Sequence, residues 1–335
     1  MEEMGEHPRP TVGLVLGAGG VVGQAYQVGA LAALEREAHW DPRDADLIVG
    51  TSAGSVTGAA LRVGVPASDL AASTYGVPTS RTGGALLKRI IPDDSPLPVP
   101  SVTSLFRPWN PPSLALIGRT VRRPLAFRPE VAAMTLLPRG RVDISERARA
   151  LHEMVGDNWP EGLWICAARR GDGARVVFGR AGSPSAPLAS AVLASCAIPG
   201  YFTPITIGGT EYFDGGVYSN TNADVLKTQR LDTVIVVSSM SASRGPAASA
   251  GPDGLLRWSV RRRLEREIAH LEAEGTTVIR LEPGPETRRA MGLWAMAEHR
   301  APRVVEAAYE ETRSRLLADP FLAGIGATPP ASAVG

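Results

Sequence analysis

The feature that most constrains this chain is the segment Gly50-Thr51-Ser52-Ala53-Gly54-Ser55, which directly follows the buried-looking run 46–49. It reads G-x-S-x-G at the end of a predicted strand, and small residues lead on into a predicted helix. A serine on such a sharp turn has its hydroxyl pushed out from the backbone, while the flanking glycines let the chain turn tightly. Ser52 is therefore a candidate nucleophile, provided that the chain also supplies a base and an oxyanion site.

The composition is that of an ordinary globular protein and excludes several classes. Of the 335 residues, 44% are hydrophobic and 21% are charged, which is enough for one large core. The formal net charge of +1 shows no excess of basic residues that would bind a polyanion, so we expect no nucleic-acid partner. Cys166 and Cys196 fit no metal motif, and we interpret them as two buried thiols without a metal site.

Nothing in the chain predicts a membrane span. The start, 1–7, is acidic and polar, and it lacks the basic and apolar regions of a signal peptide. No stretch approaches the ~20 apolar residues of a spanning helix. We expect a cytoplasmic protein, with any membrane contact peripheral and at the surface. We also expect 1–10 to be a flexible N-terminus and 321–335, small and proline-bearing, a flexible tail.

Alternating strand and helix patterns predict an α/β fold with a mainly parallel sheet. Strand, helix, strand and helix follow one another within 64 residues, which is typical of a parallel sheet covered by helices. The remaining elements complete one domain over 11–320. The predicted strands are 11–16, 46–49, 163–168, 175–178, 205–207, 211–213, 233–239 and 277–281, and the predicted helices are 21–38, 52–63, 189–196, 255–274 and a helical region 286–317.

A proline-rich stretch, 77–139, interrupts this pattern and has few periodic segments. We interpret it as a lid-like insertion, since long irregular stretches inside a compact domain are usually functional loops or lids, or else disordered. Its apolar part, from Leu86 to Trp109, is a candidate wall for an acyl-chain pocket, because such walls are mostly hydrophobic. An ordinary satellite core is the alternative for this apolar part, and an interdomain linker is the alternative for the insertion.

The first glycine cluster, 17–23, opens a predicted helix directly after a strand. Backbone N–H groups at such a point lack helix partners, and glycines let a negative oxygen approach them. The site could hold a phosphate or the oxyanion of an acyl intermediate. A dinucleotide fold is the rival interpretation, but it needs an acidic residue at the end of the next strand, where this chain has Gly50-Thr51-Ser52.

A third element supplies an acid. Asp214 stands where a predicted strand ends and the pair Gly215-Gly216 begins, so its carboxylate can face a cleft at the sheet edge. Turn chemistry is the alternative interpretation, because Asp-Gly is a common turn dipeptide. A glycine turn, a serine turn and a later D-G-G occur in this one chain, and together they narrow the range of possible functions considerably.

On these motifs the chain resembles the patatin-like phospholipase family, over roughly residues 11–65 and 160–240. The segments 194–202 and 219–224 also resemble the stretches that flank the family's D-G-G. The resemblance implies a three-layer α/β/α fold and a serine lipid acyl hydrolase that needs no cofactor and no histidine. It assigns Ser52 as nucleophile and Asp214 as base, an oxyanion hole to the N–H groups around Gly19, Gly20 and Val21, and supporting roles to Gly17, Gly23, Gly50, Gly54, Gly215 and Gly216.

One departure from the family concerns the oxyanion loop, which is usually G-G-G-x-[K/R]-G. Here Ala18 replaces a glycine and Val22 replaces the cation. The backbone donors survive both changes. The lost positive charge weakens anion binding or fits a less charged substrate, and a catalytically weak protein is one interpretation of it.

Two further functions stay open. A Ser-His-Asp α/β-hydrolase would draw its histidine from His270 or His299, although both stand in charged segments and the serine comes early for that fold. A membrane-surface or partner-binding protein would use the basic amphipathic helix that begins at Leu255. We favour a solvated face for this helix. Its apolar and basic residues are Leu255, Leu256, Arg257, Trp258, Arg261, Arg262, Arg263 and Arg266, balanced by Glu265, Glu267, Glu272 and Glu274.

Overall fold

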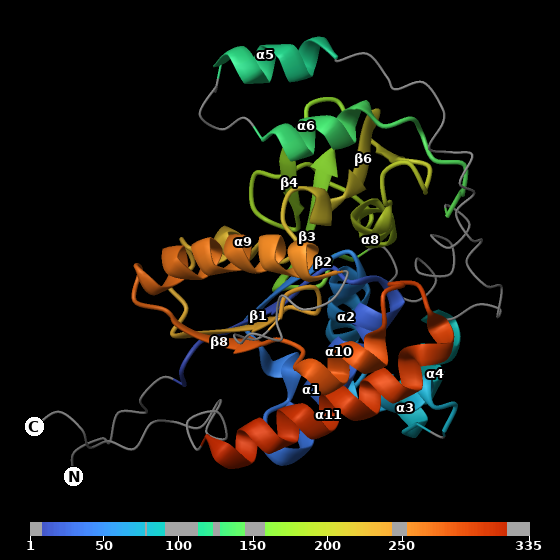
Figure 1. Ribbon diagram of the computed structural model, residues 1–335, viewed down its shortest axis with the longest axis vertical. Coiled ribbons are helices and arrows are strands. Elements are labelled where there is room, and N and C mark those ends of the chain that lie inside the picture. Colours follow the sequence, from blue (N-terminus) through green and yellow to red (C-terminus); the bar gives the residue numbers. More distant parts are fainter. Residues whose placement is uncertain are drawn as a thin grey trace, which may run out of the picture.

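In the computed structural model, an eight-stranded mixed sheet forms the centre of the molecule (Figure 1). The structure describes residues 9–77, 79–90, 113–122, 128–144, 158–242 and 253–319. Five strands run parallel in the order β3-β2-β1-β7-β8. Their bounds are β1 (Val12–Leu16), β2 (Leu47–Thr51), β3 (Leu163–Arg169), β7 (Thr233–Val237) and β8 (Thr277–Leu281).

Three antiparallel strands extend the sheet on the β3 side. β4 (Arg175–Phe178) and β6 (Thr210–Asp214) both pair with β3, and β5 (Ile205–Ile207) pairs with β6. The β5–β6 hairpin turns at Gly208-Gly209, where both residues have positive φ and only glycine is comfortable. The mainly parallel α/β sheet that the sequence predicts is therefore confirmed.

Helices cover both faces of the sheet, because each strand alternates its side chains between two cores. Leu14 and Leu16 of β1 belong to one core, which α1, α2 and α11 cover, and Val15 belongs to the other, under α9. Figure 1 shows α9 on one side of the sheet and α1, α2, α10 and α11 on the opposite side. The helices are α1 (Gly20–Glu37), α2 (Ala53–Arg62), α3 (Ala67–Thr74), α4 (Arg81–Ile90), α5 (Leu114–Arg122), α6 (Pro129–Leu136), α8 (Leu188–Cys196), α9 (Gly254–Glu272), α10 (Pro285–Met291) and α11 (Ala301–Ala318).

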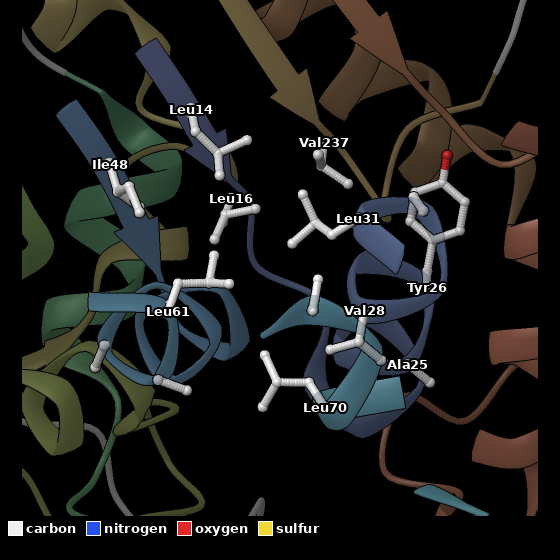
Figure 2. Packing of buried hydrophobic residues seen from close by; sticks show 14 of the residues in the cluster. Leu14, Leu16, Ala25, Tyr26, Val28, Leu31, Ile48, Leu61, Leu70 and Val237 are labelled. Atoms are coloured by element: carbon white, nitrogen blue, oxygen red, sulfur yellow. The ribbon is translucent and has the colours of Figure 1, made fainter. Parts of the chain in front are cut away.

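The larger core holds the first β-α-β-α unit together. Figure 2 shows Leu14 and Ile48 of neighbouring strands facing Leu61 of α2, with Leu31 of α1 beside them. All four side chains are at most 1% exposed. Burial of each such side chain stabilises the fold by about 1.5–3 kcal/mol, so this core holds the ends of β1 and β2 firmly in place.

The structure adds detail to two regions of the sequence. The predicted helical region 286–317 is two helices, because Gly292 adopts φ 68 and the chain then runs irregularly before α11 begins with Pro302 near its first turn. The insertion 77–139 has few periodic segments in its sequence, yet α4, α5 and α6 lie within it. The predicted pocket wall, Leu86 to Trp109, lies outside the described side chains. Among the described helices, none has the length and apolar character needed to cross a bilayer.

Candidate active site

Strand register brings the serine and D-G-G turns to the same level of the sheet. Thr51, the last residue of β2, is opposite Cys166 of β3, and the next β3 residue, Ala167, is opposite Asp214 of β6. Ser52 and Asp214 thus leave the sheet on either side of one intervening strand, and neighbouring strands lie only ~4.8 Å apart. Two positions 162 residues apart in sequence (214 − 52) are therefore neighbours in space.

The Ser52 backbone has an uncommon conformation that its surroundings hold in place. Its φ of 53° and ψ of −122° lie in a region that L-residues rarely adopt, as expected of a serine on a strand-to-helix turn. The Ser52 N–H donates to Ser195 Oγ at 2.8 Å, and Ser195 Oγ donates to the Cys166 carbonyl at 2.6 Å. The Ser55 hydroxyl donates to the Ser52 carbonyl at 2.6 Å. These bonds fix the direction in which the Ser52 side chain leaves the backbone.

A close approach between two backbones explains the second glycine of the serine motif. A β-carbon at Gly54 would lie 2.0 Å from the carbonyl oxygen of Leu16, at the end of β1. Only glycine allows α2 to start this near β1. The serine turn is consequently in close contact with the end of β1, the strand that the glycine turn follows.

Asp214 is buried beside Ser52, and its environment suits a base. The carboxylate is 6% exposed, and its Oδ1 accepts the Gly216 N–H at 2.7 Å. Burial raises the pKa of Asp214 from 3.8 to about 6, while hydrogen bonds with the Ser52 side chain and the Gly216 N–H act to lower it. The carboxylate therefore holds its own turn and also interacts with the serine hydroxyl, so the turn and catalytic interpretations of Asp214 are compatible.

The glycine turn presents backbone donors beside this pair. The N–H groups of Gly19, Gly20 and Val21 have no hydrogen-bond partner among the described residues, as expected of the start of α1. The preceding residues are fixed: Gly17 N–H donates to the Val237 carbonyl at 3.0 Å, and Ala18 N–H donates to the Asn220 carbonyl at 2.7 Å. The donors that remain are the three that the family resemblance assigns to an oxyanion hole.

The glycine turn also contacts the D-G-G turn directly. A β-carbon at Gly216 would lie 3.2 Å from Cβ of Ala18. Val22, which occupies the place of the family's usual cation, is 3% exposed and packs in the core, and its N–H donates to the Ala295 carbonyl at 3.1 Å. At this position the chain therefore contributes packing and one backbone hydrogen bond.

Asn222 links the serine and D-G-G turns, a role that the sequence analysis did not assign. Its Nδ2 donates to Thr51 Oγ1 at 3.1 Å, to the Gly215 carbonyl at 3.4 Å and to the Ser219 carbonyl at 2.6 Å. It thus bonds the residue before Ser52 and the residue after Asp214. The resemblance of 219–224 to the family was the available signal, but the partners on β2 are visible only in the fold.

Glu267 of α9 holds the loop that carries Asn222 in place through hydrogen bonds. It is 7% exposed and accepts hydrogen bonds from the hydroxyls of Ser219 and Thr221 and from the Ala223 N–H. Burial, with a smaller contribution from the charge of Asp224, raises the pKa of Glu267. The expectation of a solvated helix face is therefore wrong for Glu267, because this acid leaves water to hold the loop that carries Asn222.

Cys196 is the other reactive group near the pair. Its Sγ lies 3.8 Å from Ser55 Oγ, and burial, with the nearby charge of Asp214, raises the pKa of the thiol to about 12. A thiol with so high a pKa stays protonated at neutral pH and is a poor nucleophile. Both cysteines are free, Cys166 buried and Cys196 half-buried.

The histidines named for a triad lie in exposed positions. His270 is near the end of α9, and His299 is in the short turn before α11. No interaction of either residue with Ser52 or Asp214 occurs in the part of the chain that the structure describes. His270 acts instead on Asp224: burial raises the pKa of this carboxyl, but the hydrogen bond and charge of Arg175, followed by the charges of Arg128 and His270, bring it below its ordinary value.

The family follows from a comparison of the sequence with known families. A model of the patatin-like phospholipase family matches residues 14–227, which is more than half of the chain and includes all three turns. The chain belongs to this family. Membership implies lipid acyl hydrolase chemistry, and the match includes every residue of the predicted site. No curated protein matches the sequence.

Solved structures show distant likenesses. VipD from Legionella pneumophila is 14% identical, with a TM-score of 0.43, over 93% of this chain and 67% of that one. The type III effector ExoU is 18% identical, with a TM-score of 0.35, over 93% of this chain and 53% of that one. ExoU in its complex with SpcU, from the type III secretion system of Pseudomonas aeruginosa, is 20% identical, with a TM-score of 0.31, over 92% and 52%. This chain spans about half of the length of ExoU.

Proposed function

We propose that this patatin-like protein is a serine lipid acyl hydrolase that uses a Ser52–Asp214 dyad. The observation that carries the proposal is the buried Asp214 carboxylate, which interacts with the Ser52 side chain and has a pKa raised to about 6. A carboxyl group with an ordinary pKa near 4 is a weak base, and raising its pKa toward neutrality improves proton transfer.

The reaction proceeds in two steps. Ser52 Oγ attacks the ester carbonyl carbon while Asp214 accepts the hydroxyl proton, and the carbonyl oxygen becomes an oxyanion facing the N–H groups of Gly19, Gly20 and Val21. Asp214 returns the proton to the departing alcohol, which leaves an acyl-serine. Water then attacks the acyl-serine while Asp214 accepts its proton, and Asp214 gives that proton to Ser52 Oγ as the acyl–oxygen bond breaks and the fatty acid leaves.

The pH dependence of turnover is a direct consequence. Because Asp214 must be ionised to accept a proton and its pKa is about 6, kcat/KM for p-nitrophenyl butyrate rises with pH up to that value and is level above it. The measurement is a set of initial rates in buffers of constant ionic strength from about pH 4.5 to pH 8.5. A profile that is flat below pH 6, or one that falls as pH rises, would contradict Asp214 as the base.

Replacing both histidines separates the dyad from a histidine triad. The double variant His270→Gln/His299→Gln should keep kcat/KM within about twofold of wild type, because both side chains are exposed and lie on elements without a described contact to Ser52. The same p-nitrophenyl ester assay measures it, with thermal melting as a control for folding. A loss of more than about 10³-fold in a folded variant would favour the triad.

A further inference from the structure

Two exposed apolar segments lie at the same edge of the sheet as Ser52. Leu255, Leu256 and Trp258 in the first turns of α9 are 78%, 53% and 48% exposed, and Leu293 and Trp294 between α10 and α11 are 69% and 51% exposed. We call these five residues the apolar rim. Single exposed apolar residues are ordinary, but a group of them that includes two tryptophans beside a lipid-hydrolase site suggests a contact surface.

Hydrogen bonds attach both segments to the glycine turn. The carbonyl of Ala295, the residue after Trp294, accepts the N–H of Val22 at 3.1 Å. In α9, Arg257 donates to the Ser239 carbonyl at 3.1 Å, and Ser239 Oγ donates to the Ala18 carbonyl at 2.9 Å. The α9 start and the α10–α11 connection thus approach the turn from opposite faces of the sheet (Figure 1). The apolar rim flanks the predicted oxyanion donors on two sides.

The α9 segment of the rim is strongly basic. Between 253 and 266 the helix carries five arginines and two acids, and the acids pair with Arg257 and Arg261. Arg262 and Arg266 are exposed, and the Arg262 guanidinium lies 5.0 Å from the centre of the Trp258 ring. Exposed tryptophan and leucine beside exposed arginine is the pattern of helices that lie in the interface of an anionic bilayer, where the apolar side chains enter and the cations meet lipid phosphates.

We propose that the apolar rim inserts into the surface of a bilayer that contains anionic lipid, and that this contact places the glycine turn and Ser52 against lipid esters. The role of this contact rests on the proposed function, because insertion at this edge brings lipid substrate to the Ser52–Asp214 dyad. Charge complementarity selects an anionic bilayer over a neutral one, since the exposed cations of α9 stand beside the inserting side chains.

Vesicle binding tests the proposal with a matched pair of leucines. Leu293 is 69% exposed in the rim, and Leu317 is 70% exposed near the far end of α11. In the Ser52→Ala background, which removes turnover, Leu293→Ser and Leu255→Ser should each lower partitioning onto vesicles of phosphatidylcholine with about one-third phosphatidylserine by roughly tenfold. Leu317→Ser should leave it unchanged. Wild-type partitioning by both rim variants, or an equal loss in Leu317→Ser, would overturn the proposal.

Vesicle composition tests the charge argument. Binding to pure phosphatidylcholine should be at least about fivefold weaker than binding to the mixed vesicles, and added salt should weaken binding to the mixed vesicles because it screens the arginines. Equal binding to both vesicle types would overturn the selection of anionic lipid. Rim variants that change the oligomeric state of the protein without changing vesicle binding would assign the rim to a contact between copies, against the proposal.

Activity assays separate this proposal from the proposed function. In the protein with Ser52 intact, the Leu293→Ser variant should hydrolyse soluble p-nitrophenyl butyrate at a rate within about twofold of the wild-type rate. The same variant should hydrolyse phospholipid in vesicles about tenfold more slowly than the wild type. Equal loss on both substrates would contradict a role in membrane contact alone. If the wild type hydrolyses neither substrate, the proposed function fails, and the vesicle-binding experiment still decides whether the rim binds lipid.

Discussion

Replacing Ser52 with alanine lowers kcat/KM for p-nitrophenyl butyrate by about 10⁴-fold or more, because the variant has no hydroxyl to attack the ester. The thiol of Cys196, which lies close to Ser52, has a pKa raised to about 12 and stays protonated, so it does not replace the serine. The measurement is the initial rate with purified variant and wild type at equal concentration. A variant that retains more than a tenth of wild-type turnover would contradict Ser52 as the nucleophile.

A second substitution at the same position serves as the control for folding. Ser52 has φ 53° and ψ −122°, a backbone conformation that costs about 1–3 kcal/mol for a residue with a β-carbon. Ser52→Gly should therefore be as inactive as Ser52→Ala. Its free energy of unfolding in urea titration should be about 1 kcal/mol higher than that of the wild type, because glycine adopts this conformation without strain. Loss of activity together with gain of stability indicates a residue held in strain for its chemistry.

Replacing Asp214 with asparagine lowers turnover by about 10³–10⁴-fold, because the amide keeps the shape of the side chain but cannot accept a proton. The Asn Oδ1 can still accept the Gly216 N–H, which Asp214 binds at 2.7 Å, so the D-G-G turn should survive. The p-nitrophenyl ester assay near pH 8 measures the loss, and near-normal turnover there would contradict the dyad.

The stability of this variant provides an independent check, and its sign can be derived. The folded pKa of Asp214, about 6, lies above its ordinary value of 3.8, so the folded state binds the proton more tightly than the unfolded state. Stability is therefore lost as pH rises between these values, by up to about 3 kcal/mol at 1.36 kcal/mol per pKa unit. Asp214→Asn removes this loss, and we expect its free energy of unfolding near pH 8 to equal or exceed that of wild type.

Much of the fold could be predicted because its signals are local. Continuous apolar runs such as 234–237 mark buried parallel strands, and the glycines within 17–20 and 50–54 mark the turns that follow two of these strands. The carboxyl ends of neighbouring parallel strands meet at one edge, so the glycine and serine turns had to be close. The predicted hairpin and the paired strands β3 and β4 are likewise present, with bounds shifted by at most a residue or two.

The rest depends on partners distant in sequence, which no local pattern reveals. Glu267 looks like one more charge on a basic amphipathic helix, yet it leaves water because the hydroxyls of Ser219 and Thr221 satisfy its carboxylate. Asn222 adopts a left-handed backbone conformation, φ 54°, and reaches Thr51 from 171 residues away. The break at Gly292 serves the same edge, since it lets Ala295 approach the start of α1.

Fluorophosphonate labelling followed by peptide mapping tests the dyad most directly. We expect the wild-type protein to be modified at Ser52. Modification should be about tenfold faster near pH 8 than near pH 5, because the Asp214 carboxyl, with a pKa of about 6, must be ionised to activate the serine. Modification at another residue, or at Ser52 with the same rate at both pH values, would contradict a serine activated by Asp214.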